Sequence, residues 1–202
     1  MTEVSINKQV KLSEHFTLGE LCKTGVKTAD GNIPSHVHIE NLKRVCEWLE
    51  ELRRRYNQQY VCENEERSVS PPELGGARGG LNEGMSGASS DHPAHTGTPP
   101  NLGGEINTDA PIIITSGYRS AELNKKVGGS PTSNHLTGCA VDIRVAGIEQ
   151  AMRYAVILMD YADETRQDYD ELLIEKNSRG AIWLHFAVRP KDNRRKTMFI
   201  QK

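Results

Sequence analysis

The stretch Ser133-Asn-His-Leu-Thr-Gly-Cys-Ala-Val-Asp142 brings two metal-binding residue types beside an apolar strand. Residues 140–145 alternate between apolar and polar side chains, which predicts a β-strand. Asp142 lies inside that strand, where a lone buried carboxylate is costly, so it must be paired, hydrogen-bonded or bound to a cation. His135 precedes the strand in a loop rich in Ser and Gly, which can fold back and bring the imidazole to Asp142.

A second histidine, His185, lies in the strongly apolar run Trp183-Leu-His-Phe186. Two imidazoles and one carboxylate suit Zn²⁺, and three protein ligands leave the fourth position open for water, as in catalytic zinc sites. The spacing alone leaves other interpretations open. A histidine seven residues before an aspartate is common by chance, and His185 could be a hydrogen-bonded histidine of the core.

The segments around these motifs have alternating helix and strand patterns. Amphipathic periodicity predicts helices over about 36–56 and 148–159, and Ser120 is expected to cap a short helix that ends near Val127. Strands are expected over 111–115, 140–145, 172–175, 181–188 and 197–200, with the third and fourth forming a hairpin. This order predicts an α+β fold with a small, mostly antiparallel sheet flanked by helices, rather than a repeated βαβ array.

Residues from about 63 to 109 are dense in Gly, Pro, Ser, Asn and acidic residues and contain no aromatic residue. Such a stretch cannot bury enough apolar surface to offset the entropy lost on ordering. It also explains the low mean hydropathy of −0.59. We therefore predict one domain over residues 1–202 that carries a disordered insertion at about 63–109.

Charge and hydropathy argue against several partners. The net charge of −2, from 25 basic and 27 acidic residues, provides no field that would attract nucleic acid or an anionic membrane. No apolar run has membrane-spanning length, and the first residues lack the apolar stretch of a secretory signal. We expect a monomer that is cytoplasmic as synthesised. The run Arg194-Arg195-Lys196 is expected to form a solvated turn.

Several ordered motifs point to one family. In chain order they are Ser116-Gly-Tyr-Arg-Ser120, Leu123-Asn124, Val127-Gly-Gly-Ser130, Ser133 to Asp142, and Trp183-Leu-His185. Together they resemble the zinc D-Ala-D-Ala carboxypeptidase family, which includes VanX-type dipeptidases and phage endolysin peptidases and shares its fold with the hedgehog signalling domain. The opening segment KLSEHFTLGEL is similar to the start of the phage and bacterial branch.

The resemblance implies that His135, Asp142 and His185 bind one Zn²⁺ ion. It implies a metallopeptidase of the carboxypeptidase or endopeptidase kind, in which zinc-activated water hydrolyses peptidoglycan stem peptides or D-alanyl peptides. It also suggests a phage or prophage lysin released to the cell wall. The alternative is a catalytically impaired, zinc-containing module that binds the wall or builds a phage particle.

Three residues are implied to contact the substrate, namely Arg119, Tyr118 and Ser133. A guanidinium at position 119 can hold a carboxylate or stabilise charge on the scissile carbonyl. Its alternative role is a salt bridge that clamps the loop after the 111–115 strand. Ser133 has a similar alternative, because its hydroxyl can merely cap the loop.

The general base is open. Many family members carry an acid three residues before the last zinc histidine, but that position is Ile182 here. Resemblance to the phage branch favours Glu175 as the base. If residues 176–180 form the hairpin loop, Glu171 instead lies opposite His185, on the same face as Glu175, and a bulge could reconcile the two. We expect Glu175, whose alternative role is to orient a zinc histidine.

Overall fold

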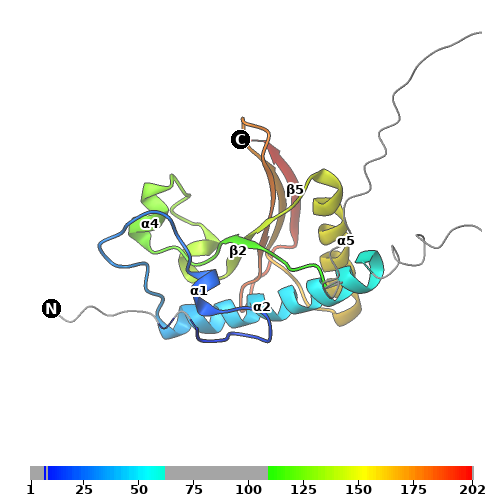
Figure 1. Cartoon of the computed structure of the whole chain (residues 1–202), viewed down its shortest axis with the longest axis horizontal. Coiled ribbons are helices and arrows are strands. Elements are labelled where there is room, and N and C mark those ends of the chain that lie inside the picture. The colour runs from blue at the N-terminus through cyan, green and yellow to red at the C-terminus, as the bar shows by residue number, and fades with distance from the viewer. Residues whose placement is uncertain (1–6, 8, 62–108, 202) are drawn as a thin grey trace, which may run out of the picture.

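The computed structural model describes residues 7, 9–61 and 109–201 (Figure 1). Its helices are α1 (Leu18–Leu21), α2 (His36–Tyr56), the short π-helix η1 (Asn57–Val61), α4 (Ala121–Lys126), the 3-10 helix η2 (Asn134–Thr137) and α5 (Ile148–Thr165). Its strands are β1 (Ile114–Ser116), β2 (Ala140–Arg144), β3 (Glu171–Lys176), β4 (Ile182–Ala187) and β5 (Lys196–Gln201). The predicted insertion at about 63–109 lies outside the described residues except for Asp109, which pairs with Arg53 of α2.

These strands form one five-stranded sheet in the order β1-β2-β4-β3-β5. The first four pair antiparallel, and β5 runs parallel to β3 at the edge. Figure 1 shows α4 on one side of β2 and the strand β5 on the other. The predicted α+β fold with a small, mostly antiparallel sheet is confirmed.

Alternation along the strands divides the sheet into an apolar face and a polar face. The apolar face is buried and supplies much of the core, through Val141, Ile143, Leu172, Ile174, Leu184 and Phe186. Directly paired residues share a face, so the opposite face carries Asp142, Glu171, Glu175 and His185. The strands that build the core therefore also present the candidate site.

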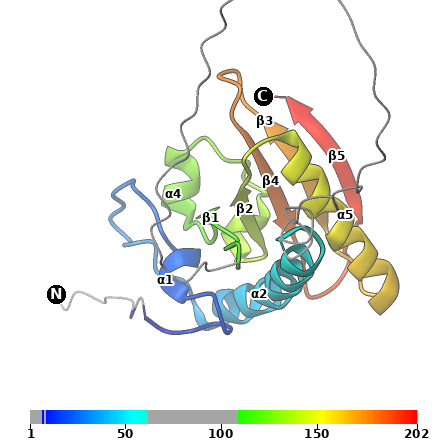
Figure 2. The same ribbon diagram turned by 45° about the vertical axis from the view of Figure 1, so that its right-hand side comes forward.

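Helices α2 and α5 cover the apolar face. Ser35 is the N-cap of helix α2, and its hydroxyl accepts a hydrogen bond from the His38 amide. The helix has the bounds that its periodicity predicts. Trp48 of α2 packs edge-on against Tyr161 of α5, with ring centroids 4.8 Å apart. Figure 2 shows α2 below the sheet and α5 along its side. No helix among the described residues is long and apolar enough to cross a membrane.

The predicted β3–β4 register was wrong by two residues. Glu175 pairs with Trp183 rather than with Ala181, and the residue opposite His185 is Leu173 rather than Glu171. The pairing continues without a bulge from one end of the hairpin to the other. A shift of two residues preserves the faces, so the prediction that both glutamates share a face with His185 is confirmed.

The turn explains this difference in register. The side-chain oxygen of Asn177 accepts hydrogen bonds from the backbone N–H groups of Arg179 and Ala181, each at 3.0 Å. Gly180 has a φ of +87°, which favours glycine. The loop is therefore 177–181 rather than 176–180, and moving it by one residue along the chain moves the register by two.

Candidate metal centre and catalytic cleft

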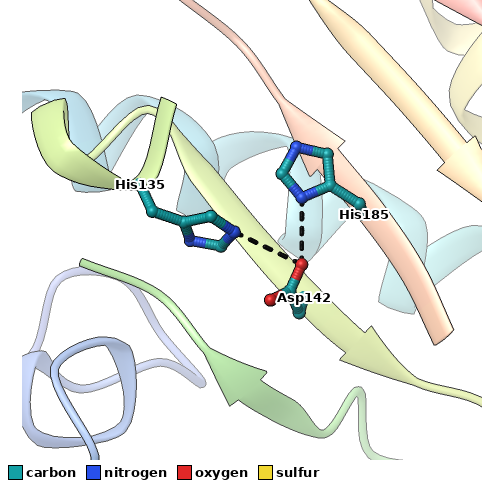
Figure 3. A group of neighbouring side chains, drawn as sticks. All are labelled: His135, Asp142 and His185. Atoms are coloured by element: carbon teal, nitrogen blue, oxygen red, sulfur yellow. Dashed lines mark hydrogen bonds and ion pairs between the residues drawn. The ribbon is translucent and has the colours of Figure 1, made fainter. Parts of the chain in front are cut away.

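Three side chains predicted to bind zinc converge on the polar face of the sheet (Figure 3). His135 comes from η2, Asp142 from β2 and His185 from β4, and each is at most 8% exposed. The carboxylate oxygen Oδ1 of Asp142 lies 3.3 Å from His135 Nε2 and 2.9 Å from His185 Nδ1. The three potential ligand atoms lie within 4.8 Å of one another.

The backbone fixes the orientation of the His135 ring. Its Nδ1 atom lies 2.6 Å from the carbonyl oxygen of Gly117, and this oxygen can only accept a hydrogen bond. The proton of the neutral ring is therefore on Nδ1, and Nε2 presents its lone pair to Asp142. A lone pair facing a carboxylate oxygen is unfavourable without a cation between them. The donor set thus fits a bound metal ion.

Gly117 can make this contact because its backbone packs closely against the N-terminal segment. A Cβ atom at position 117 would lie 2.2 Å from the carbonyl oxygen of Leu21. That same oxygen accepts a hydrogen bond from the Tyr118 amide at 2.7 Å. Asn32 also donates to the Tyr118 carbonyl and accepts from the Ser120 amide. The segment around α1 therefore holds the loop after β1 in place.

Asp142 also pairs with Arg119. The Nη2 atom of Arg119 lies 2.5 Å from Oδ2 of Asp142, and its Nε donates to the Ser116 hydroxyl at 2.8 Å. The salt bridge that was the alternative role of Arg119 is therefore present. Arg119 nevertheless lines the cleft, so a clamping role and a substrate-facing role are compatible.

Burial and charge shift the pKa values of the three side chains in different directions. Burial alone would raise the pKa of Asp142, but the charges and hydrogen bonds of the two histidines lower it well below its usual range. Burial lowers the pKa of His135. Burial would also lower that of His185, yet hydrogen bonding to Asp142 and Glu171 raises its pKa to about 9. Without metal, His185 is therefore the protonated imidazole of the pair.

Glu171 lies beside the other nitrogen of His185, with Oε2 at 3.6 Å from Nε2. Its carboxylate accepts a hydrogen bond from Asn134 Nδ2 at 2.9 Å and pairs with Arg194 Nη2 at 3.0 Å. Lys196 Nζ approaches to 3.5 Å. The Glu171 carboxylate is thus surrounded by donors that hold it against His185.

Asp170 extends this network and was missed by the sequence analysis. It is fully buried and accepts hydrogen bonds from Asn134 at 2.7 Å and from Arg194 at 2.6 and 2.8 Å. Arg189 pairs with it at 2.7 Å. An acidic residue directly before an apolar strand resembles the signal that identified Asp142, which lies inside a strand. Arg194 and Arg195 are exposed in a loop, as expected for a solvated turn, but Arg194 also pairs with Asp170 and Glu171, and Lys196 begins β5.

Glu175 lies on the other side of Leu173 from Glu171, and it is 6% exposed. Because Leu173 is opposite His185, both glutamates are diagonal neighbours of this histidine. Glu175 lines the cleft together with Trp183. Ile182 lies on the opposite face and packs against the core, so in this register position 182 does not face the site.

The three ligand candidates line a cleft of about 750 Å³. Arg119 and Ser133 line it as well, and Ser133 also caps η2 by accepting from the His135 amide at 3.3 Å. Tyr118 is not among the described residues that line the cleft. Its ring is buried and stacks on His38, with centroids 4.8 Å apart. The structure therefore brings together all the expected site residues except Tyr118.

Comparison with known proteins gives one family match. Residues 105–168 match the sequence model of the family described as Peptidase M15. The matched segment includes His135 and Asp142 and ends before His185. None of the curated proteins compared with the chain matches it. The match covers about a third of the chain, agrees with the ordered motifs and with the His-Asp-His cluster, and supports the peptidase M15 family of the zinc D-Ala-D-Ala carboxypeptidase type.

Proposed function

We propose that this protein is a zinc metallopeptidase that hydrolyses peptidoglycan stem peptides or D-alanyl peptides. The Peptidase M15 match supports a metallopeptidase. The observation that carries the proposal is the convergence of two imidazoles and one carboxylate at the floor of a polar cleft. These donor types favour zinc over calcium or magnesium, which prefer oxygen ligands.

In this proposal His135, Asp142 and His185 hold the zinc ion. When bound, zinc polarises the scissile carbonyl and makes a water molecule acidic enough to attack it at neutral pH. Arg119 keeps Asp142 oriented through Nη2, and its remaining N–H groups can donate to the carbonyl oxygen as negative charge develops there. Ser133 lines the same cleft and can donate its hydroxyl to a substrate carbonyl.

We assign the role of general base to Glu175. A base must take a proton from the attacking water and deliver it to the leaving amine. Glu171 is poorly suited to this task, because Asn134, Arg194 and Lys196 surround its carboxylate. We assign to it the positioning of His185 through Nε2. Glu175 lines the cleft on the other side of Leu173, and its place diagonal to His185 supports this role.

The proposal is tested on purified, cross-linked peptidoglycan, with and without a chelator. We expect chelator-sensitive release of new amino groups, restored by added zinc. Glu175→Gln should slow the release by about 10²–10⁴-fold, whereas Glu47→Gln, which changes an exposed glutamate of α2, should not slow it. If one zinc ion binds but no wall substrate is hydrolysed, the protein is instead a zinc-containing binding module.

A further inference from the structure

A second hollow borders the cleft. It has a volume of about 450 Å³ and lies between the segment after β2 and the β3–β4 turn. Thr115 and Trp183 line both hollows, so the two meet at these side chains. The first hollow alone falls within the size range of sites that enclose a drug-sized ligand, roughly 300–1,000 Å³. The two adjoining hollows therefore form one groove that is longer than either alone.

The strand register places the metal-binding residues between the two ends of this groove. Asp142 pairs with His185, and the next pair on the same face is Arg144 with Trp183. Two residues along a strand correspond to about 7 Å. The second hollow therefore begins about two residues of an extended peptide away from the metal site. In the first hollow, the cleft continues past Arg119 to the loops at 23–25 and 128–133.

Each of the two hollows is lined by an exposed cation that has no side-chain partner among the described residues. Arg144 lines the second hollow and Lys23 lines the first, and both side chains are exposed. Neither makes a side-chain hydrogen bond or ion pair with any residue in the described part of the chain. The other cations of the cleft differ, since Arg119 pairs with Asp142 and Arg194 with Asp170. Arg144 and Lys23 are thus available to carboxylates of a ligand.

We propose that the groove binds an extended acidic peptide on both sides of the metal site, and that the protein cuts this peptide at an internal bond. This makes it an endopeptidase rather than a carboxypeptidase, and it rests on the proposed metallopeptidase function. Water supplies the hydroxyl group to the acyl carbon and a proton to the leaving amine, as the C–N bond breaks. Arg144 and Lys23 bind substrate carboxylates on opposite sides of that bond.

The cleavage site is tested with soluble muropeptides, including cross-linked dimers, released from peptidoglycan by a muramidase. Mass spectrometry of the products should identify fragments that each keep two or more amino acids. Release of a single C-terminal residue as the only product would overturn the proposal while leaving the metallopeptidase function intact.

The role of Arg144 is tested with Arg144→Gln. We expect KM for these muropeptides to rise about five-fold with little change in kcat, the size expected for one solvent-exposed charge contact. The matched control is Arg166→Gln, an exposed arginine at the end of α5 that lines neither hollow. Amidation of the substrate carboxylates should remove the difference between the Arg144 variant and the wild type. Equal KM values for the two variants would contradict the proposal.

Trp183 provides a binding readout that does not depend on catalysis. The only other tryptophan, Trp48, is buried in the core. An acidic muropeptide that occupies both hollows must therefore change the Trp183 fluorescence, and Arg144→Gln should weaken its binding about five-fold. Binding of this kind without any turnover would reject the metallopeptidase but retain the peptide groove. No fluorescence change at millimolar muropeptide would reject the groove.

Discussion

The Oε2 atom of Glu171 lies 3.6 Å from Nε2 of His185, while Nδ1 of the same imidazole lies 2.9 Å from Asp142. Carboxylates therefore approach both nitrogens of this ring, and each nitrogen has a separate task. Nδ1 points to the other ligand candidates, and Nε2 points to a carboxylate that other side chains hold in place. Carboxylates in this position fix the tautomer of metal-binding histidines and increase their basicity.

This arrangement predicts different defects for the two glutamates of β3. Glu171→Gln should weaken zinc binding by about 10–100-fold, with activity recovering at saturating zinc. Glu175→Gln should leave zinc affinity unchanged and lower kcat by about 10²–10⁴-fold. Zinc titrations monitored by calorimetry, combined with kcat at saturating zinc, separate the two effects. If both variants lose kcat equally at saturating zinc, the division of roles is incorrect.

Zinc binding should release a proton at neutral pH. The pKa of His185 in the metal-free protein is raised to about 9, so zinc must displace the proton from this ring. Zinc affinity should rise about tenfold per pH unit up to pH 9 and then level off. Calorimetry at pH 7 in buffers of different ionisation enthalpy counts the protons. A count of zero would contradict the assignment.

The raised pKa of His185 also makes the stability of the metal-free protein depend on pH. A raised pKa means that the proton on His185 stabilises the folded state. This contribution is complete below the ordinary value of 6.5 and is lost as the pH rises through about 9. Urea unfolding of the metal-free protein between pH 6 and 10 should therefore show a falling midpoint.

Gly117→Ala should damage both stability and metal binding. The added Cβ would lie 2.2 Å from the Leu21 carbonyl oxygen, so the loop after β1 must move. We expect a loss of about 1–3 kcal/mol in the free energy of unfolding. Zinc affinity should also fall, because the Gly117 carbonyl orients His135.

The matched control for this substitution is Gly147→Ala. Nothing lies within 4 Å of a Cβ atom at position 147, and the φ of 175° is an extended conformation open to any residue. Chemical denaturation compares the stability of the two variants, and zinc titration compares their zinc affinity. If Gly117→Ala and Gly147→Ala have equal stability and equal zinc affinity, the close approach of Gly117 to Leu21 does not position His135.

Asp170→Asn should destabilise the fold. The wild-type carboxylate is fully buried and binds Arg194, Arg189 and Asn134. Breaking a fully buried pair costs about 3–5 kcal/mol, and we expect about 2–3 kcal/mol here because the arginines are partly exposed. The exposed neighbour Asp168, which pairs with Arg195 at 3.4 Å, is the control, and Asp168→Asn should cost under about 1 kcal/mol.

Asp170 should also contribute to acid stability. Burial alone would raise its pKa, but hydrogen bonds from Arg194 and Asn134 lower it to about 2. Its contribution is therefore complete above the ordinary value of 3.8 and is lost as the pH falls through about 2. The difference in unfolding free energy between wild type and Asp170→Asn should shrink over this range. A difference that is constant down to pH 2 would contradict the role of this carboxylate.

The elements that follow from local sequence were predictable. Helix α2 has a continuous apolar stripe and a Ser35 cap, and both of its ends agree with the prediction. The same holds for α4, where Ser120 caps the start and Gly128 follows the end with a φ of +71°. The metal-binding candidates were also recognisable, because Asp142 and His185 are polar residues within apolar strands.

The features that depend on tertiary contacts were not predictable. The hairpin register depends on which residue closes the turn, and the side chain of Asn177 decides this through two hydrogen bonds. Tyr118 belongs to a motif that lines the cleft, yet its ring turns away and stacks on His38. Arg194 lies 24 residues after Asp170 in the sequence, and it reaches this carboxylate because β5 pairs with β3.

The most direct test of the central claim is a zinc titration of the chelator-treated protein with cross-linked peptidoglycan as the substrate. The release of new amino groups should rise in proportion to added zinc and reach its plateau at about one equivalent, the stoichiometry of a single three-ligand site. His185→Ala should lower zinc affinity and abolish the zinc-dependent release of amino groups. Full activity before any zinc is added, or a plateau that does not change when His185 is replaced, would contradict the account.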